Sequence, residues 1–204
     1  TVTVSEQLAY VYEGVELPDK PVRITFDDGY YNNYVYAYPL LEQRGMRAVV
    51  SVIGSQTAQY TENGVENAYW SHLRIERLAE MQDVFEVQNH SWNLHEYGER
   101  RGCLRRRGED ADSYAALLRE DAEQTQELLT EAGLPAPTCY TYPFGACSDE
   151  SEVILQDMGF LCTLGCEERL NQITRDPACL YEMGRYNRGA GESTQSYLKR
   201  ALGE

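Results

Sequence analysis

Short runs of β-branched and aromatic residues alternate along this chain with longer stretches of helical periodicity. The predicted strands are residues 22–26, 47–53, 84–89, 138–142, 160–164 and a short one near 181–186. The predicted helices lie near residues 34–44, 71–82, 114–132, 150–158 and 194–202. This alternation favours an α/β fold, in which helices cover a parallel sheet that is either doubly wound or closed into a barrel.

The length of the chain narrows this choice. A chain of 204 residues is expected to form one domain, here residues 1–204, and no linker or repeat divides it. A full eight-stranded barrel typically takes about 250 residues, so we expect a barrel with a missing or distorted strand. In either architecture the chemistry belongs at the carboxyl ends of the strands.

The formal net charge of −15 limits the classes of partner. An acidic surface repels phosphate backbones, so nucleic acid is not an expected partner, whereas a metal cation is compatible with the charge. No stretch approaches the roughly 18 consecutive apolar residues that a membrane helix needs. The chain begins at Thr1 rather than Met, so we expect processing or trimming and read no location from it.

Two acidic residues follow the first predicted strand, in the sequence Thr-Phe-Asp-Asp-Gly at 25–29. Adjacent carboxylates raise each other's pKa, and a bound cation would remove this repulsion. Gly29 would let the backbone turn tightly around such an ion. An Asp-Asp-Gly turn without any ligand is the alternative interpretation of the same residues.

Two of the three histidines, His90 and His95, follow another predicted strand. Five positions separate them, so neither a helix nor a strand directs both side chains at one ion, and the segment must turn. Strand ends of a parallel sheet converge, so Asp28, His90 and His95 would supply three metal ligands and leave open positions for water and substrate. The second carboxylate, Asp27, would then lie beside the bound water as a base.

A third motif, Thr-Tyr-Pro-Phe-Gly at 141–145, also follows a predicted strand. A turn of this composition fixes the backbone direction, so the Phe144 N–H could point into the site. A simple strand-terminating turn is the alternative.

These three motifs, in this order, resemble the polysaccharide deacetylases with a NodB-homology domain, carbohydrate esterase family 4. The resemblance spans roughly residues 21–202, and the longer spacing between His90 and His95 is similar to a subset that includes exopolysaccharide deacetylases. It implies a distorted (β/α) barrel of about seven parallel strands. It also implies Asp27 as catalytic base, and Asp28, His90 and His95 as ligands of a divalent ion, usually Zn²⁺, with Co²⁺ or Ni²⁺ also accepted.

In this resemblance the Phe144 backbone N–H helps to hold the oxyanion, but two family features are missing. Thr141 replaces an arginine that often opens the third motif, so Asp27 is expected to lose a charged partner. No histidine follows His95, so the usual general acid is absent. The proton donor stays open between Asp27, another carboxylate at the site and His72, which we expect to be exposed in the first turn of a helix. Two interpretations of Arg185 and Arg188 are open, contact with substrate and pairing with acidic loops.

The resemblance implies a metal-dependent hydrolase that removes N-acetyl groups from N-acetylglucosamine units of an acetylated cell-surface or extracellular polysaccharide. An O-acetyl xylan esterase, and a carbohydrate-binding pseudoenzyme without turnover, are the alternatives. A secreted or cell-surface location follows only from the family's substrates. Most of the 16 tyrosines are expected to pack in the core with their hydroxyls at the surface, although tyrosines can also stack on sugar rings.

Overall fold

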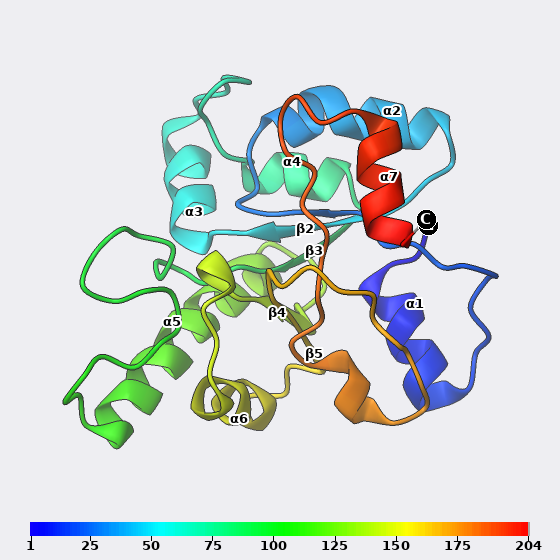
Figure 1. Ribbon diagram of the computed structural model, residues 1–204. Coiled ribbons are helices and arrows are strands. Elements are labelled where there is room, and N and C mark those ends of the chain that lie inside the picture. The colour runs from blue at the N-terminus through cyan, green and yellow to red at the C-terminus, as the bar shows by residue number, and fades with distance from the viewer. Residues whose placement is uncertain (204) are drawn as a thin grey trace.

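The computed structural model describes residues 1–203 and contains one sheet of five parallel strands. The strands follow one another in space in chain order, β1 to β5 (Figure 1). Their bounds are β1 Thr25–Phe26, β2 Ala48–Val52, β3 Phe85–Asn89, β4 Cys139–Thr141 and β5 Cys162–Leu164. Parallel pairing places the carboxyl ends of all five strands along the same edge of the sheet.

The expected barrel of about seven strands is corrected to a half-barrel of five. In the described part of the chain β5 does not pair with β1, and the sixth predicted strand is reduced to one parallel bridge between Leu164 and Met183. Between residues 166 and 186 the chain is mostly exposed, and only Leu180, Met183 and Gly184 are buried. A parallel strand that is buried on both faces needs apolar residues on both, and this segment has too few of them to form one.

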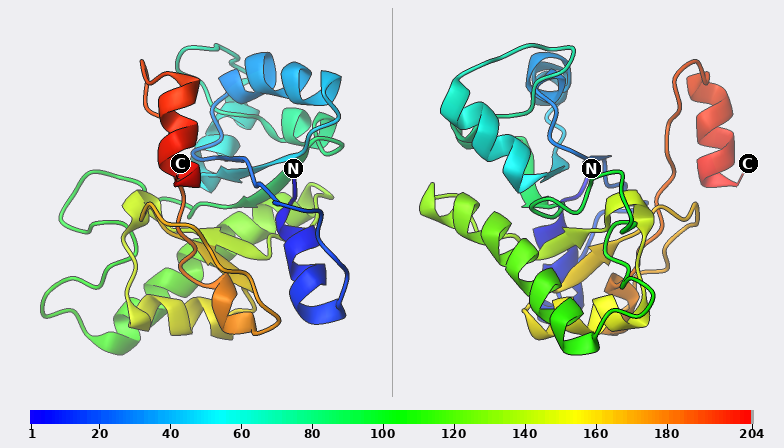
Figure 2. Two further views of the ribbon diagram at one scale, coloured as in Figure 1. Left: turned by 45° about the vertical axis from the view of Figure 1, so that its right-hand side comes forward. Right: turned by 90° about the vertical axis from the view of Figure 1, so that its left-hand side faces the viewer.

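Helices lie outside the curved sheet (Figures 1 and 2). The longest is α5, and the others are between five and ten residues long. Their bounds are α1 Val4–Leu8, α2 Tyr38–Gln43, α3 Gly54–Asn63, α4 Ile75–Glu80, α5 Ala111–Glu131, α6 Asp149–Asp157 and α7 Thr194–Leu202. Two π-helical turns, Ala9–Glu13 and Asn33–Ala37, extend α1 and precede α2, and 3-10 turns form at Pro143–Gly145 and Pro177–Leu180.

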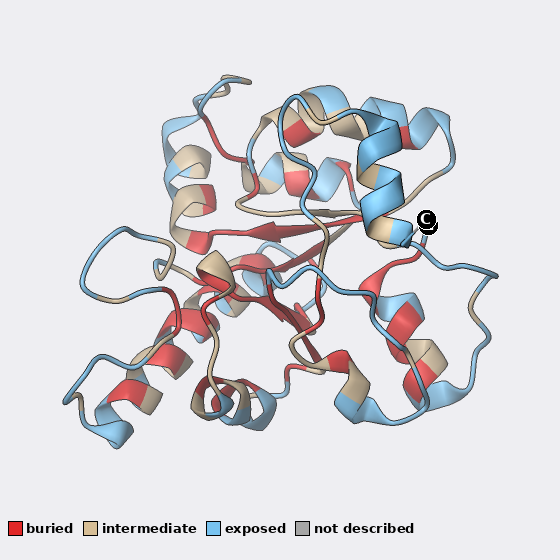
Figure 3. Cartoon of the chain, in the orientation of Figure 1, coloured by how far each residue is buried: buried red, intermediate tan, exposed pale blue. Residues whose placement is uncertain are grey.

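Apolar side chains cover both faces of the sheet, as a parallel sheet requires. On β2, Val50 and Val52 pack in one cluster with α4, whereas Val49 points the other way, into a cluster with α1. A third cluster joins α5 and α6 to Tyr140 of β4 and to Tyr142 directly after it. All five residues of β2 are therefore buried, and β2 to β5 form the buried centre of the molecule, whereas β1 is half-buried (Figure 3).

The five longer strand predictions are confirmed in position; four are shortened by one to two residues, and the first, 22–26, is reduced to Thr25–Phe26. The predicted helix at 71–82 is shorter, since α4 begins at Ile75, and α1 and α3 were not predicted. Helix α3 buries only Gly54 and Thr57, so its sequence carries almost no apolar periodicity. No helix within residues 1–203 has the length and apolar character needed to cross a membrane.

Candidate metal centre

Asp27, Asp28 and Gly29 form the turn directly after β1. Asp28 and Gly29 both have left-handed backbone angles, with φ of 68° and 70°. A Cβ atom on residue 29 would lie 2.8 Å from Cγ1 of Val52 at the end of β2, so only glycine fits there. The requirement for Gly29 comes from both the positive φ and this close approach to the neighbouring strand.

A short antiparallel contact with residues 71–73 holds this turn in place. The Leu73 N–H donates to the Gly29 carbonyl at 2.7 Å, and the His72 ring Nδ1 donates to the Asp28 carbonyl at 2.9 Å. His72 is 7 % exposed and lies before α4, so the expectation of an exposed first-turn residue was wrong. Its ring is buried because it stacks on Tyr30 and Tyr60 and donates a hydrogen bond to the Asp28 carbonyl.

His90 follows β3, and both its backbone and its ring are fixed. Its N–H donates to the carbonyl of Val52 at 3.0 Å, and its ring Nδ1 lies 2.7 Å from the carbonyl of Thr141. Because a carbonyl only accepts hydrogen bonds, Nδ1 must carry the proton, and Nε2 is left with a lone pair. This second contact fixes the ring orientation in the way that is usual for metal-binding histidines.

The turn between His90 and His95 is anchored from helix α5. One carboxylate oxygen of Asp121 accepts the Trp92 N–H at 2.9 Å, and the other accepts the Asn93 N–H at 2.8 Å. Burial raises the pKa of Asp121 to about 6, even though these two hydrogen bonds favour the charged form. Sequence analysis missed Asp121, whose only signal is an acidic residue on the buried side of an amphipathic helix.

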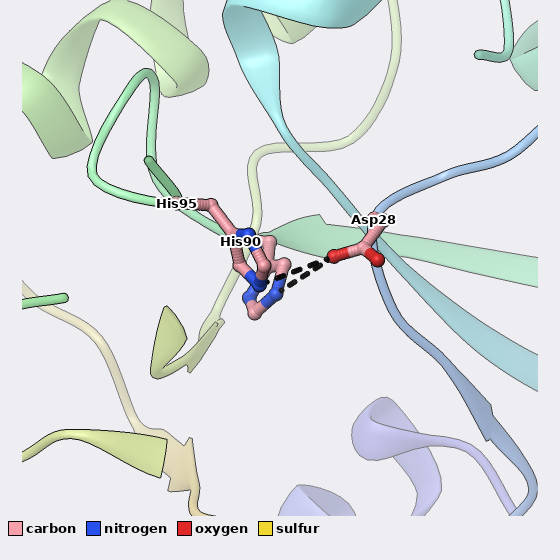
Figure 4. Close-up of side chains that lie close together, drawn as sticks. All are labelled: Asp28, His90 and His95. Carbon is pink, nitrogen blue, oxygen red and sulfur yellow. Dashed lines mark ion pairs between the residues drawn. The ribbon is translucent and has the colours of Figure 1, made fainter. Parts of the chain in front are cut away.

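The structure brings the three expected ligands together. Suitable donor atoms of Asp28, His90 and His95 all lie within 4.8 Å of one another. Asp28 Oδ1 is 3.3 Å from His90 Nε2 and 3.5 Å from His95 Nε2. Figure 4 shows the two imidazoles and the carboxylate pointing toward one another, Asp28 from the end of β1, His90 from the end of β3 and His95 from the loop that follows.

The chemistry of these donors fits a divalent cation. Among the described residues, Asp28 Oδ1 is buried without a hydrogen-bond partner, which is costly for a carboxylate oxygen that faces no cation. Burial raises the pKa of Asp28, but His90 and His95 in their protonated forms outweigh it and hold the net pKa below its ordinary value. One carboxylate with two imidazoles leaves open coordination positions, which is typical of catalytic rather than structural sites.

Asp27 points to a different partner. Arg185 binds it through two hydrogen bonds, from Nη1 to Oδ1 at 2.6 Å and from Nη2 to Oδ2 at 2.8 Å. Arg185 also donates from Nε to the Gly165 carbonyl at 2.9 Å, which fixes the guanidinium plane. Burial raises the pKa of Asp27, but these hydrogen bonds and the positive charge of Arg185 bring the net pKa below its usual value.

The expectation that Asp27 lacks a charged partner is therefore wrong. Thr141 indeed carries no charge; its hydroxyl shares a hydrogen bond of 2.7 Å with Ser51. Arg185 supplies the guanidinium instead, from the segment that follows the bridge at Met183. Because 158 residues separate Arg185 from Asp27, no local pattern could indicate that they pair. The only signal in the sequence was the presence of an arginine in that region.

Phe144 lies in the 3-10 turn after β4 with a φ of 59°. Its ring packs on the His95 ring, with centroids 4.3 Å apart. The second residue of a 3-10 turn has no partner for its N–H inside the turn, so this donor is free of the turn's own hydrogen bonds. The third motif thus lies against the candidate metal centre, as expected from the convergence of strand ends.

Comparison with known proteins identifies the family. The sequence model of the polysaccharide deacetylase family matches residues 14–162, which is most of the chain. The chain belongs to the polysaccharide deacetylase family. The Asp-Asp-Gly turn, the histidine turn and β1 to β4 all fall inside the matched region, whereas Arg185 lies beyond it.

Among curated proteins, this polysaccharide deacetylase is similar to poly-beta-1,6-N-acetyl-D-glucosamine N-deacetylase of Escherichia coli strain K12. The two are 26 % identical over 169 residues, covering 72 % of this chain and 25 % of that protein. A putative polysaccharide deacetylase of Bacillus subtilis, YxkH, is 33 % identical over 92 residues, covering 45 % of this chain and 29 % of the relative. The chain therefore spans about a quarter of the length of these relatives.

Solved structures with the same fold support the half-barrel. A de-N-acetylase from Aggregatibacter actinomycetemcomitans superposes with a TM-score of 0.79 at 19 % identity, covering 98 % of this chain and 82 % of that one. IcaB from Ammonifex degensii superposes with a TM-score of 0.72 at 23 % identity, covering 98 % and 80 %. At such identities the likeness concerns the fold.

Proposed function

We propose that this polysaccharide deacetylase is a metal-dependent hydrolase that removes N-acetyl groups from N-acetylglucosamine units of a polysaccharide. The observation that carries the proposal is the cluster of Asp28, His90 and His95, with Asp27 held next to it by Arg185. The name of the Escherichia coli relative, a poly-beta-1,6-N-acetyl-D-glucosamine N-deacetylase, favours the N-acetyl over the O-acetyl bond.

Asp28, His90 and His95 would hold the ion, which we propose to be Zn²⁺, with Co²⁺ or Ni²⁺ as alternatives that suit the same donors. When bound there, such an ion supplies Lewis-acid chemistry, which polarises a carbonyl and lowers the pKa of water from about 15.7 toward 7. The hydrogen bond from Nδ1 to the Thr141 carbonyl fixes the His90 ring so that Nε2 faces the proposed ion site. Its tautomer needs no rearrangement when the site is filled.

Asp27 is proposed as the base. Arg185 keeps it ionised and fixes both oxygens, so it can take a proton as water attacks the acetamide carbon. The free N–H of Phe144 is proposed to donate to the oxygen that becomes negative in this step. Removing one such donor typically costs about 2.7–4 kcal/mol of transition-state stabilisation.

The same carboxyl group is proposed to return the proton to the departing amine, which completes cleavage of the C–N bond and releases acetate. His72 is poorly suited to this role. Burial lowers the pKa of its ring, so it is neutral near pH 7, and its one N–H is bonded to the Asp28 carbonyl. Its remaining nitrogen has no proton to donate.

Two substitutions test the assignment. Asp28→Ala is expected to abolish metal uptake and acetate release together, because it removes the carboxylate ligand. Asp27→Asn is expected to keep the metal while turnover falls by about 10²–10⁴-fold, the usual contribution of a general base. Metal content per chain and acetate release from N-acetylglucosamine oligomers measure both.

A fully active Asp27→Asn protein would remove the base assignment. Glycan binding without acetate release, under any divalent metal, would make the chain a carbohydrate-binding pseudoenzyme. Faster acetate release from acetylxylan than from N-acetylglucosamine oligomers would make it an O-acetyl esterase. The presence of Arg185 weakens the pseudoenzyme alternative, since that alternative rested partly on a missing arginine.

We further propose that residues 1–204 work as a single deacetylase domain, since the core clusters all pack on the one sheet. An acetylated polysaccharide is the proposed partner, and a secreted or cell-surface location the proposed place of action. Both follow from the kind of substrate and rest on the proposed activity.

A further inference from the structure

Arg185 reaches Asp27 from a stretch of chain that has little apolar packing. After β5 the chain runs outward, passes through the 3-10 turn at Pro177–Leu180 and returns beside its own start (Figure 1). The returning stretch, residues 182–185, meets β5 at the bridge between Leu164 and Met183. Of these four residues only Met183 belongs to an apolar core cluster. Hydrophobic burial therefore fixes one residue of the stretch, and polar contacts fix the others.

Every backbone N–H of residues 182–185 donates a hydrogen bond, beginning with two that hold the stretch to β5. The Glu182 N–H donates to Thr163 Oγ1 at 2.6 Å, and the Met183 N–H donates to the Thr163 carbonyl at 2.9 Å. In return, the Gly165 N–H donates to the Met183 carbonyl at 2.9 Å. These contacts continue the parallel ladder of the sheet as far as Met183.

Gly184, which lies between Met183 and Arg185, binds a side chain instead of a strand. Its N–H donates to Asn171 Oδ1 and its carbonyl accepts from Asn171 Nδ2, both at 2.8 Å. A side-chain amide offers an acceptor and a donor as a peptide group does, so Asn171 takes the place of a neighbouring strand. The Arg185 N–H then donates to the Glu167 carbonyl at 2.9 Å.

The chain also folds back tightly at Gly184. A Cβ atom on residue 184 would collide with Cγ of Arg169 and would lie 2.7 Å from the carbonyl oxygen of Glu167. Residues 167–171 therefore lie directly against the backbone that precedes Arg185. A shift of either side of this contact would move the other, because no free space separates them.

The Arg185 side chain depends on this fixed backbone. Besides Asp27, the guanidinium donates from Nη1 to Thr25 Oγ1 at 3.2 Å and from Nε to the Gly165 carbonyl at 2.9 Å. An arginine side chain has many rotamers, and a bidentate contact with a carboxylate is made by few of them. The pairing with Asp27 therefore requires that the Arg185 backbone stays in place.

We infer that Asn171 is a positioning residue, which holds the backbone of Gly184 and thereby keeps the Arg185 guanidinium against Asp27. This inference rests on the proposed function, in which Asp27 is the base, and deepens it by adding a residue that acts through Arg185. Asn171 is exposed and lies in a polar loop, so it orients another side chain and does not itself contact the reacting atoms.

The first test compares Asn171→Ala with the wild type in acetate release from N-acetylglucosamine oligomers. The variant is expected to lower kcat by about 5- to 20-fold, since a small displacement of the base is costly. KM and metal content per chain are expected to stay the same, because neither the ion ligands nor the substrate contacts change. Gln172→Ala is the matched control at the next exposed position and is expected to be neutral.

The same substitution in an Arg185→Met background shows whether Asn171 acts through Arg185. There Asn171→Ala is expected to change kcat by less than about 2-fold, because residues that act as one unit are not additive. Gly184→Ala disturbs the same contact without altering Asn171 and is expected to show the same dependence on Arg185. A loss of kcat that is equally large with and without Arg185 would overturn the inference.

A measurement without turnover separates this inference from the proposed function. The Arg185 Nε–H donates to the Gly165 carbonyl, so its exchange with water can be followed by NMR in chelator-treated protein, and Arg185→Met assigns the signal. Asn171→Ala is expected to speed this exchange by about 10-fold, the effect of losing two hydrogen bonds. Faster exchange supports the inference even if the wild type releases no acetate. An exchange rate unchanged in both Asn171→Ala and Gly184→Ala overturns it.

Discussion

Asp27 and Asp28 are neighbours in the sequence, but the structure gives them different partners. Asp28 faces His90 and His95, whereas Asp27 faces the guanidinium of Arg185. Two adjacent carboxylates would raise each other's pKa if left alone. Here Arg185 lies beside Asp27, and His90 and His95 lie beside Asp28, so the net pKa of both carboxyl groups is lowered.

At the residue scale, Arg185→Met is expected to move the acid limb of the kcat/KM profile to higher pH. In the wild type Arg185 keeps the pKa of Asp27 below its ordinary value, so the carboxylate persists as the pH falls. Without the guanidinium, burial dominates, the pKa rises, and the carboxylate is lost at a higher pH. Near pH 7 the looser carboxylate is expected to lower kcat/KM by roughly 10- to 100-fold.

Two further variants make that measurement specific. Arg185→Lys keeps the charge but lacks the bidentate contact. It is therefore expected to return the acid limb toward its wild-type pH, while kcat/KM near pH 7 stays below the wild-type value. Arg188→Met changes the same charge at an exposed neighbour that contacts Glu192 and Thr194, and is expected to be neutral. An unchanged acid limb in Arg185→Met would contradict the role of Arg185.

At the scale of elements, helix α5 does more than cover the sheet. It carries Asp121, which accepts two backbone N–H groups of the histidine turn. Burial of a carboxylate is unfavourable, as the raised pKa of about 6 shows, and here it accompanies contacts that shape the candidate metal centre. A helix that covers the sheet thereby also anchors the turn between His90 and His95.

Asp121→Asn is expected to weaken metal binding by about 10- to 100-fold, the usual effect of losing a group that orients a ligand. The amide keeps one accepting oxygen but turns an NH₂ group toward the other backbone N–H, so one of the two contacts is lost. Competition with a chelator measures the affinity. Glu123→Gln makes the same chemical change at an exposed position of α5 and should leave the affinity unaltered; equal affinities in all three proteins would contradict the anchoring role.

Elements also differ in how well the sequence predicts them. The five strands are recognisable because each is a short run of apolar, β-branched residues, and Pro39 falls within the first two residues of α2, as its fixed φ favours. Helix α3 and the bridge at Met183 are not recognisable, because few of their residues are buried. Patterns of hydrophobicity predict an element only when it has a buried face.

At the scale of the whole molecule, the proposed ion would connect strands that are not neighbours. Asp28 follows β1 and the two histidines follow β3, with β2 between them. Any ligand that binds the folded chain more tightly than the unfolded one raises stability, by about 2.7 kcal/mol at a concentration of 100 Kd. Metal binding at this site should therefore stabilise the entire sheet.

Adding Zn²⁺ to chelator-treated protein is expected to raise Tm by roughly 5–10 °C at such a concentration, given about 2–4 °C per kcal/mol for a chain of this size. Thermal unfolding with and without the metal measures the shift, and renewed chelation should reverse it. Asp28→Ala should show no shift. A Zn²⁺ response that survives in Asp28→Ala would place the ion elsewhere.

The sequence by itself determined the strands, their parallel arrangement and the candidate metal-binding residues, because buried strands and compact motifs such as Thr-Phe-Asp-Asp-Gly consist of residues that are neighbours in the chain. Asp28, His90 and His95 were predictable as a set because strand ends in a parallel sheet share one edge. Only the tertiary structure decided that Arg185 pairs with Asp27, that Asp121 anchors the histidine turn and that His72 is buried. These contacts join segments far apart in the chain, and they depend on how the half-barrel curls, which no local pattern encodes.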